Sequence, residues 1–169
     1  TTQYTDHAGT QFQDRYANWF KNKESELELP LYTSVDIRDA GFKLSIVDTN
    51  LFPAGFNNVC DLSLKEAEPY FKKALNTRVS ECKSILFFIE EHTRNIWYLE
   101  NVVSIKNMIE NIGIEVKVVT LFDAFPESDK EKELITIKTA LDNELDIYNL
   151  RKLLKNESSP YPWDLILLN

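Results

Sequence analysis

Apolar residues recur with helical spacing in three stretches of the chain, which predicts three helices. The stretches run from about residue 12 to 28, from 63 to about 79, and from 95 to 112. Pro30 ends the first stretch, and Ser63 with Glu66 fits a capping box at the start of the second. Gly113 stands where the third helix needs a left-handed residue after its last turn.

Short apolar runs between these stretches predict buried strands at residues 84–89, 114–120 and 163–168. The first two flank the third helix, so we expect a right-handed crossover that makes them parallel neighbours in one sheet. The alternation at residues 133–138 predicts a strand with one wet face, and residues 145–154 fit either a strand pair or a short helix. The sequence therefore predicts an α/β fold, with residues 1–169 as a single domain.

Composition and charge narrow the classes of partner. The chain has 169 residues, 43% of them hydrophobic, and a formal net charge of −8, which argues against a nucleic-acid surface and provides no basic patch for a membrane. The longest apolar runs are too short to span a bilayer, and no signal peptide opens the chain, so we expect a cytoplasmic protein. Cys60 and Cys82 lack metal-ligand spacing and are expected to be free thiols.

The most unusual stretch is the polar segment that follows the apolar run Phe42–Val47. It brings together one carboxylate, amides, a proline and a glycine, and its candidate binding residues are Asp48, Asn50, Asn57 and Asn58. Asp36 and Arg38 form a second polar cluster upstream. We expect the run to be a strand that delivers these groups to a site, because ligands of open α/β sheets bind beyond the carboxyl ends of strands. The alternative is a turn that only stabilises itself through Asp48 and Asn50.

The polar segment that follows a strand is called an exit. The first exit follows Phe42–Val47, and a second one follows the predicted strand at 84–89 and carries Arg94. If the two strands are neighbours, the two exits converge. Arg38 and Arg94 would then clamp a carboxylate with their planar donors, Asp36 or Asp48 would pair with an ammonium group, and the asparagines would orient the ligand. Arg94 could instead bridge to Glu90 or Glu91. Four nearby residues have structural alternatives of the same kind, with His92 as a capping residue, Asn95 as a helix N-cap and Trp97 and Tyr98 as residues packed against the sheet.

The two polar clusters, Ser34–Arg38 and Val47–Asn58, resemble the N-terminal part of the proteobacterial glutamate–cysteine ligases of ATP-grasp type. The resemblance covers most of the chain and is sharpest at residues 34–58 and 90–98. It implies a pre-ATP-grasp, Rossmann-like fold, which is a three-layer sandwich with a largely parallel central sheet and helices on both faces. It also implies a substrate-binding domain at the N-terminal end of a longer ligase. The chain ends at Asn169, directly after an apolar run, which favours the same interpretation.

The resemblance implies an enzyme that makes γ-glutamylcysteine from glutamate and cysteine in glutathione biosynthesis, through an acyl phosphate formed with ATP. ATP and Mg²⁺ would be bound mainly outside this segment, which has no glycine-rich phosphate loop, and the segment alone would be inactive. The catalytic residues stay unassigned, and a homo-oligomer stays open. A non-catalytic amino-acid-binding or regulatory module is the alternative, since fold does not dictate function.

Overall fold

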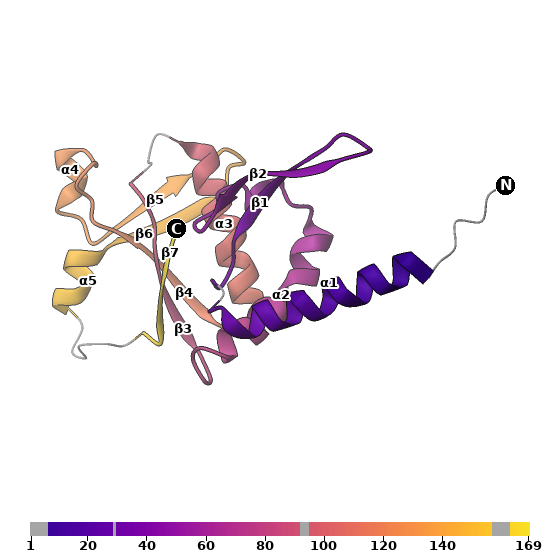
Figure 1. Ribbon diagram of the computed structural model, residues 1–169. Helices are drawn as coiled ribbons and strands as arrows, with labels where there is room; N and C mark the ends of the chain where they lie inside the picture. Colours follow the sequence, from indigo (N-terminus) through magenta and orange to yellow (C-terminus); the bar gives the residue numbers. More distant parts are fainter. Residues whose placement is uncertain (1–6, 29, 92–94, 157–162) are drawn as a thin grey trace. The chain divides into compact units, whose positions relative to one another are not determined.

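The computed structural model describes residues 7–28, 30–91, 95–156 and 163–169. The chain divides into two compact units, residues 1–30 and 31–169. The first unit contains α1 (His7–Glu26), drawn in indigo in Figure 1. Tyr16 lies 6.1 Å from Trp19 and 6.3 Å from Phe20 between ring centroids, so the predicted aromatic stripe exists on this helix. All three rings are more than half exposed.

The second unit contains a five-stranded sheet in the order β5-β6-β4-β3-β7. Its strands are β3 (Ser84–Phe88), β4 (Glu115–Thr120), β5 (Leu134–Lys138), β6 (Glu144–Asn149) and β7 (Leu165–Leu168). β3 pairs in parallel with both β4 and β7, β4 pairs in parallel with β6, and only β5 is antiparallel to its neighbour. The predicted α/β class and largely parallel sheet are confirmed.

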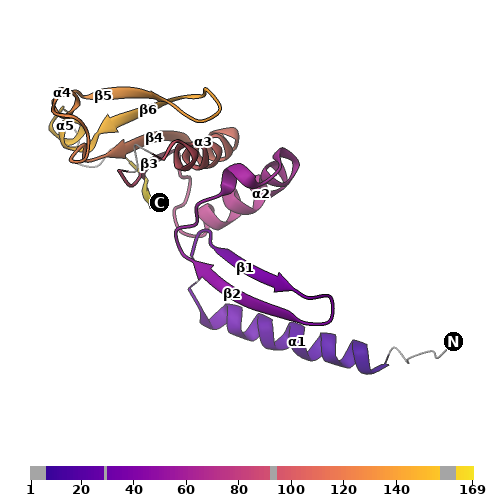
Figure 2. The same ribbon diagram turned by 90° about the horizontal axis from the view of Figure 1, so that it is seen from above.

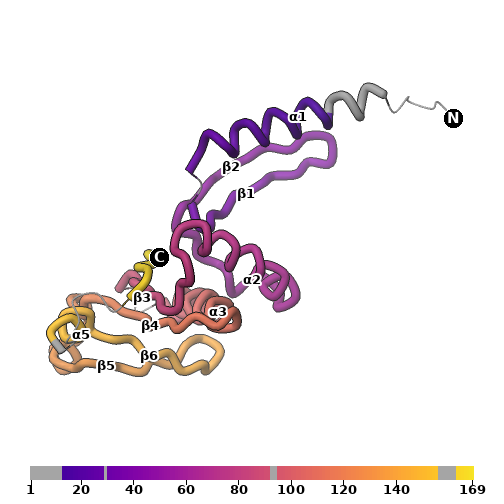
Figure 3. Tube along the Cα trace, turned by 90° about the horizontal axis from the view of Figure 1, so that it is seen from below, coloured from indigo at the N-terminus to yellow at the C-terminus, as the bar shows by residue number. Residues whose placement is uncertain are grey.

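A 3-10 helix and an α-helix precede β3, and three further helices connect the strands of this sheet. They are η1 (Phe56–Asn58), α2 (Asp61–Asn76), α3 (Ile96–Asn111), α4 (Glu127–Lys130) and α5 (Leu150–Asn156). Figure 3 traces α3 between the two parallel strands β3 and β4, which confirms the expected crossover. Gly113 has φ +86°, the left-handed conformation predicted after this helix. None of the described helices combines the length and the apolar character needed to cross a membrane.

The core forms where α3 packs on the sheet. Leu99, Val102 and Ile105 of α3 are at most 1% exposed, as are Ile85 and Phe87 of β3. Leu86 and Val119, which alternate with the core positions of their strands, are buried as well. Alternate residues of a strand point to opposite faces, so both faces of the central strands are covered, consistent with a three-layer sandwich.

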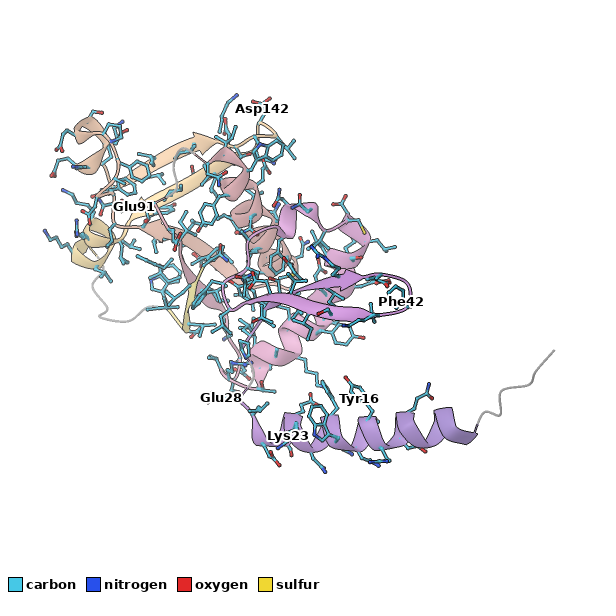
Figure 4. The ribbon with its side chains drawn as sticks, turned by 45° about the horizontal axis from the view of Figure 1, so that its top comes forward. Tyr16, Lys23, Glu28, Phe42, Glu91 and Asp142 are labelled. Carbon is cyan, nitrogen blue, oxygen red and sulfur yellow. The ribbon has the colours of Figure 1, made fainter. Side chains whose placement is uncertain are left out.

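The remaining two strands, β1 (Ser34–Asp39) and β2 (Leu44–Asn50), form a separate antiparallel sheet, here called the ribbon. Figure 2 shows it apart from the five-stranded sheet. Ala40 donates its N–H to Lys43 O, and Gly41 at φ +80° donates its N–H to the Asp39 carboxylate, which closes a tight turn. Phe42 stands at the tip, 91% exposed (Figure 4).

The register of the ribbon sorts its residues onto two faces. Asp36 lies opposite Asp48, whereas Ile37 lies opposite Ile46, because Val47 is an extra residue in β2. Since cross-strand partners share a face and successive residues alternate, one face is polar and the other mainly apolar. The polar face carries Ser34 with Asn50, Asp36 with Asp48 and Arg38 with Ser45, and the other carries Val35 with Thr49, Ile37 with Ile46 and Asp39 with Leu44.

Three expectations from the sequence are wrong. The run Phe42–Val47 is not a neighbour of the strand at 84–89, because residues 34–39 form a strand that the sequence analysis did not recognise and pair with it across the turn at Gly41. The second helix begins at Asp61 with Cys60 as its N-cap, and the Cys60 side chain makes no capping bond to the helix backbone, so the capping box at Ser63 does not form. β7 was expected to be fully buried, yet as an edge strand it buries only Leu167. Residues 144–156 resolve the open alternative as a strand followed by a helix.

Candidate functional site

The loop that follows the ribbon lies against the N-terminal end of α3. Asn95 is the N-cap, since its side-chain oxygen accepts a hydrogen bond of 3.1 Å from the Tyr98 N–H. Asn101, fully buried on the next turns of the helix, accepts a bond of 2.9 Å from the Phe56 N–H. This bond between positions 45 residues apart fixes η1 beside α3. The two polar exits therefore converge here, by a route that does not need β2 and β3 to be neighbours.

A pocket of about 420 Å³ opens between this loop and α3. It is lined by Ala54, Gly55, Asn57, Asn58, Asn95, Trp97, Tyr98 and Asn101. Four side-chain amides and two aromatic rings thus surround one cavity, and none of the described lining residues carries a formal charge. Amides both donate and accept hydrogen bonds, so this lining suits orientation of a ligand with carboxylate and ammonium groups rather than proton transfer. Trp97 is 57% exposed and forms an accessible wall.

Gly55 and Tyr98 shape the pocket through the backbone conformation of one and the structural hydrogen bonds of the other. Gly55 has φ +105°, a conformation that favours glycine, and a Cβ there would lie 3.4 Å from Asn58 Nδ2. The Tyr98 hydroxyl accepts a bond of 3.1 Å from the Glu90 N–H and donates one of 3.1 Å to Asn169 O. Burial raises the pKa of Tyr98 to about 12. The phenol is therefore neutral at physiological pH and ties the end of β3 to α3.

The other predicted binding residues lie on the polar face of the ribbon. Asp36 faces Asp48 across the two strands, and Arg38 and Asn50 share that face. Asp48 accepts bonds from its neighbours, 2.9 Å from the Thr49 N–H and 3.2 Å from Asn50 Nδ2. These bonds are local, but Asp48 and Asn50 lie in β2 and pair with β1, so they do not form the turn considered above. The described residues include no group of three histidine, cysteine, aspartate or glutamate side chains able to hold a metal ion.

The structure thus divides the predicted site residues into two sets. Asn57 and Asn58 line the pocket together with Asn95, while Asp36, Arg38, Asp48 and Asn50 are not among the described residues that line it. Arg94 and His92 lie outside the described residues. The sequence analysis missed Asn101 and Asn169. The signal for Asn101 was available, because an asparagine beside Val102 interrupts the apolar face of a helix, and such a residue needs a specific partner.

A neighbouring turn accounts for one acidic residue of the second exit. The Glu91 carboxylate accepts the Asp123 N–H at 2.8 Å and also the Ala124 N–H, which anchors the loop after β4 (Figure 4). Asp123 in turn pairs with Arg151 through two bonds of 2.5 and 2.9 Å, and this pairing lowers the pKa of Asp123. The role of the Glu91 side chain is therefore accounted for by its bonds to the loop after β4.

Comparison with known proteins gives a consistent result. The family model described as glutamate-cysteine ligase matches residues 9–169. Among solved structures, the "Putative gamma-glutamylcysteine synthetase" from Methylobacillus flagellatus KT is similar, with a TM-score of 0.75 and 28% sequence identity over 92% of this chain. The matched part is 36% of that protein, so this chain spans about a third of its length. No curated protein matches the chain.

Proposed function

The chain belongs to the glutamate-cysteine ligase family, and we propose that it is the N-terminal, substrate-binding part of an ATP-dependent ligase of ATP-grasp type. In the proposed reaction the γ-carboxylate of glutamate is activated as an acyl phosphate, and the amine of cysteine displaces phosphate to give γ-glutamylcysteine for glutathione synthesis. The observation that carries the proposal is the amide-lined pocket beside α3, which lies inside the region that the family model matches.

The proposal assigns binding and orientation to this chain. The described residues provide neither a metal-ligand group nor a glycine-rich phosphate loop, so they do not fit ATP and Mg²⁺, and no step of phosphoryl transfer is derived from them. ATP and the metal would be held by other parts of the parent enzyme. Holding the reacting groups in the right geometry can itself lower a barrier by several kcal/mol, roughly 7 to 11 in the best cases.

Within the proposal each set of residues has its own task. Asn57 and Asn58 orient an amino-acid substrate in the pocket, and Arg94, which precedes Asn95 in the sequence, clamps a carboxylate with its planar donors. The polar face of the ribbon, with Asp36, Arg38, Asp48 and Asn50, provides complementary charges for the ammonium and carboxylate groups of the amino acids. Glutamate and cysteine are the substrates that the family implies.

Calorimetric titration of the 169-residue chain with L-glutamate tests this function. We expect binding, weakened about ten- to a hundredfold in Asn57→Ala and Asn58→Ala, since a hydrogen bond to a charged group contributes about 1.5 to 3 kcal/mol. Asn76→Ala is the matched control, because Asn76 is exposed at the end of α2, outside the pocket. We also expect no release of ADP from ATP. Absence of glutamate binding, or clear ATP turnover by this chain, would contradict the proposal.

A further inference from the structure

Asn169 forms a hub that joins the sheet to the wall of the pocket. Its amide nitrogen donates to Pro53 O at 3.1 Å and to the Tyr32 hydroxyl at 3.3 Å. Its side-chain oxygen accepts from Asn101 Nδ2 at 3.1 Å. Its own N–H donates to Phe88 O at 3.1 Å, so the residue is fixed at the carboxyl end of β3. Both hydrogens and the oxygen of this amide are therefore used.

The partners of Asn169 hold the loop 53–56 at both ends. The bond to Pro53 O fixes the start of the loop directly. The bond from Asn101 fixes its end, because the same amide of Asn101 accepts the Phe56 N–H at 2.9 Å. Between these anchors lie Ala54 and Gly55, and the chain then enters η1 with Asn57 and Asn58. One side of the pocket is thus positioned by a residue that is not among its described lining residues.

We propose that Asn169 is a positioning residue for the pocket. It sets the distance between the loop 53–58 and α3 and so determines the affinity for an amino acid with carboxylate and ammonium groups, without touching that ligand. This inference rests on the proposed function. A side chain with only local effects would bond to its own strand, whereas this side-chain amide connects α3, Tyr32 and the loop, and the backbone N–H of the same residue bonds to β3.

The test compares Asn169→Ala with Asn149→Ala. Asn149 is a matched control, because it is also an asparagine at the end of a strand with both amide groups bonded, to Lys130 O and to the Arg151 N–H, away from the pocket. In Asn169→Ala we expect exchange of the Phe56 amide hydrogen to accelerate and the dissociation constant of L-glutamate to rise, each about tenfold, as for one lost hydrogen bond. In Asn149→Ala both quantities should stay at their wild-type values.

A second variant keeps the test decisive if Asn169→Ala folds poorly. Asn169→Asp retains an oxygen for Asn101 but loses both N–H donors, so glutamate binding should weaken while Phe56 exchange changes less than in Asn169→Ala. Faster Phe56 exchange with unchanged glutamate affinity would overturn the positioning role, as would equal effects in Asn149→Ala. If the wild-type chain binds no glutamate, the proposed function fails, and Phe56 exchange still decides whether Asn169 holds the loop.

Discussion

The structure contains two antiparallel hairpins that differ in what surrounds them. The hairpin β5–β6 joins the large sheet through β4, and its turn is bonded to the buried Glu100 of α3. Among the described residues the ribbon β1–β2 has no third strand, and the bonds described at its turn lie within residues 39–43. Figure 4 marks the two turns at Asp142 and Phe42. In β6, Leu145 and Ile147 are 1% exposed, whereas every residue of β2 is exposed.

The difference shows that an alternating pattern does not by itself make a strand part of a core. Both hairpins have one apolar face, but only β5–β6 has a partner for it among the described residues. Two strands alone are marginally stable in water, and Asp36 opposite Asp48 places like charges side by side. The ribbon is therefore suited to presenting its side chains, and the large sheet to holding the pocket.

The largest expected difference is in the free energy of unfolding when the same substitution is made in each hairpin. Ile147→Ala in β6 should lower the free energy of unfolding by about 2 to 5 kcal/mol, because it leaves a cavity in the core. Ile46→Ala in β2, where the side chain is 68% exposed, should change it by less than about 0.5 kcal/mol. Urea unfolding measures both. A large loss in Ile46→Ala would mean that the apolar face of the ribbon is packed in solution.

The two turns should respond differently to loss of a carboxylate. Glu100 is 2% exposed and accepts bonds from Leu141 N at 2.7 Å, from Asn143 Nδ2 at 3.1 Å and from the Thr139 hydroxyl. Glu100→Gln puts an N–H group against these donors and should cost about 1.5 to 3 kcal/mol, with faster exchange of the Leu141 amide. Asp39→Asn, at the exposed turn of the ribbon, should leave the unfolding midpoint unchanged. A stable Glu100→Gln variant would show that α3 does not anchor the β5–β6 turn.

Substitutions at the residues with positive φ in the two turns should give a smaller difference in stability between the hairpins. Gly41 has φ +80° with open space around it, so Gly41→Ala should cost about 1 kcal/mol from strain alone. Asp142, in the other turn, has φ +59°, and Asp142→Gly should be neutral or slightly stabilising. We expect the cost at Gly41 to appear as faster amide exchange within residues 34–50 and not in β3. Exchange that rises equally in β3 would show that the ribbon and the large sheet unfold together.

The smallest expected effect at neutral pH is that of Tyr98, which belongs to the part of the chain around the large sheet. The ribbon contains no tyrosine. The folded chain keeps the phenolic proton up to the raised pKa of about 12, whereas an unfolded chain loses it near 10. Unfolding therefore releases a proton in this interval, and the stability that Tyr98 contributes is complete below pH 10 and falls as the pH rises toward 12. Tyr98→Phe should have a shallower alkaline slope.

The sequence predicted the elements whose pattern is set locally. The crossover of residues 84–120 combines two continuous apolar runs with a helical stripe, a pattern that has few alternative arrangements, and Asn95 and Gly113 are caps with a clear local signal. The ribbon was missed because its strands alternate polar and apolar residues and were interpreted as a polar cluster and a single strand that leads to a site.

The candidate site was predictable only in part. Asn57 and Asn58 attracted attention because several amides close together are unusual, and they line the pocket. Asp36, Arg38, Asp48 and Asn50 were expected to join them, but the ribbon register that places those four on one face depends on pairing across a turn. Asn101 and Asn169 act through bonds between residues far apart in the chain, 45 and 116 positions in the two bonds to the loop. The local pattern shows that Asn101 needs a partner, but it does not identify the partner of either residue.

The extra residue Val47 lets the ribbon change length at one point without changing its two faces. Asp48 already lies opposite Asp36 and Ile46 opposite Ile37, so removal of Val47 would leave a regular antiparallel ladder with the same cross-strand partners. Only the local bend and the added twist that a bulge gives a strand would be lost. Related chains should therefore tolerate loss of the residue at position 47 while keeping polar residues on one face and apolar residues on the other.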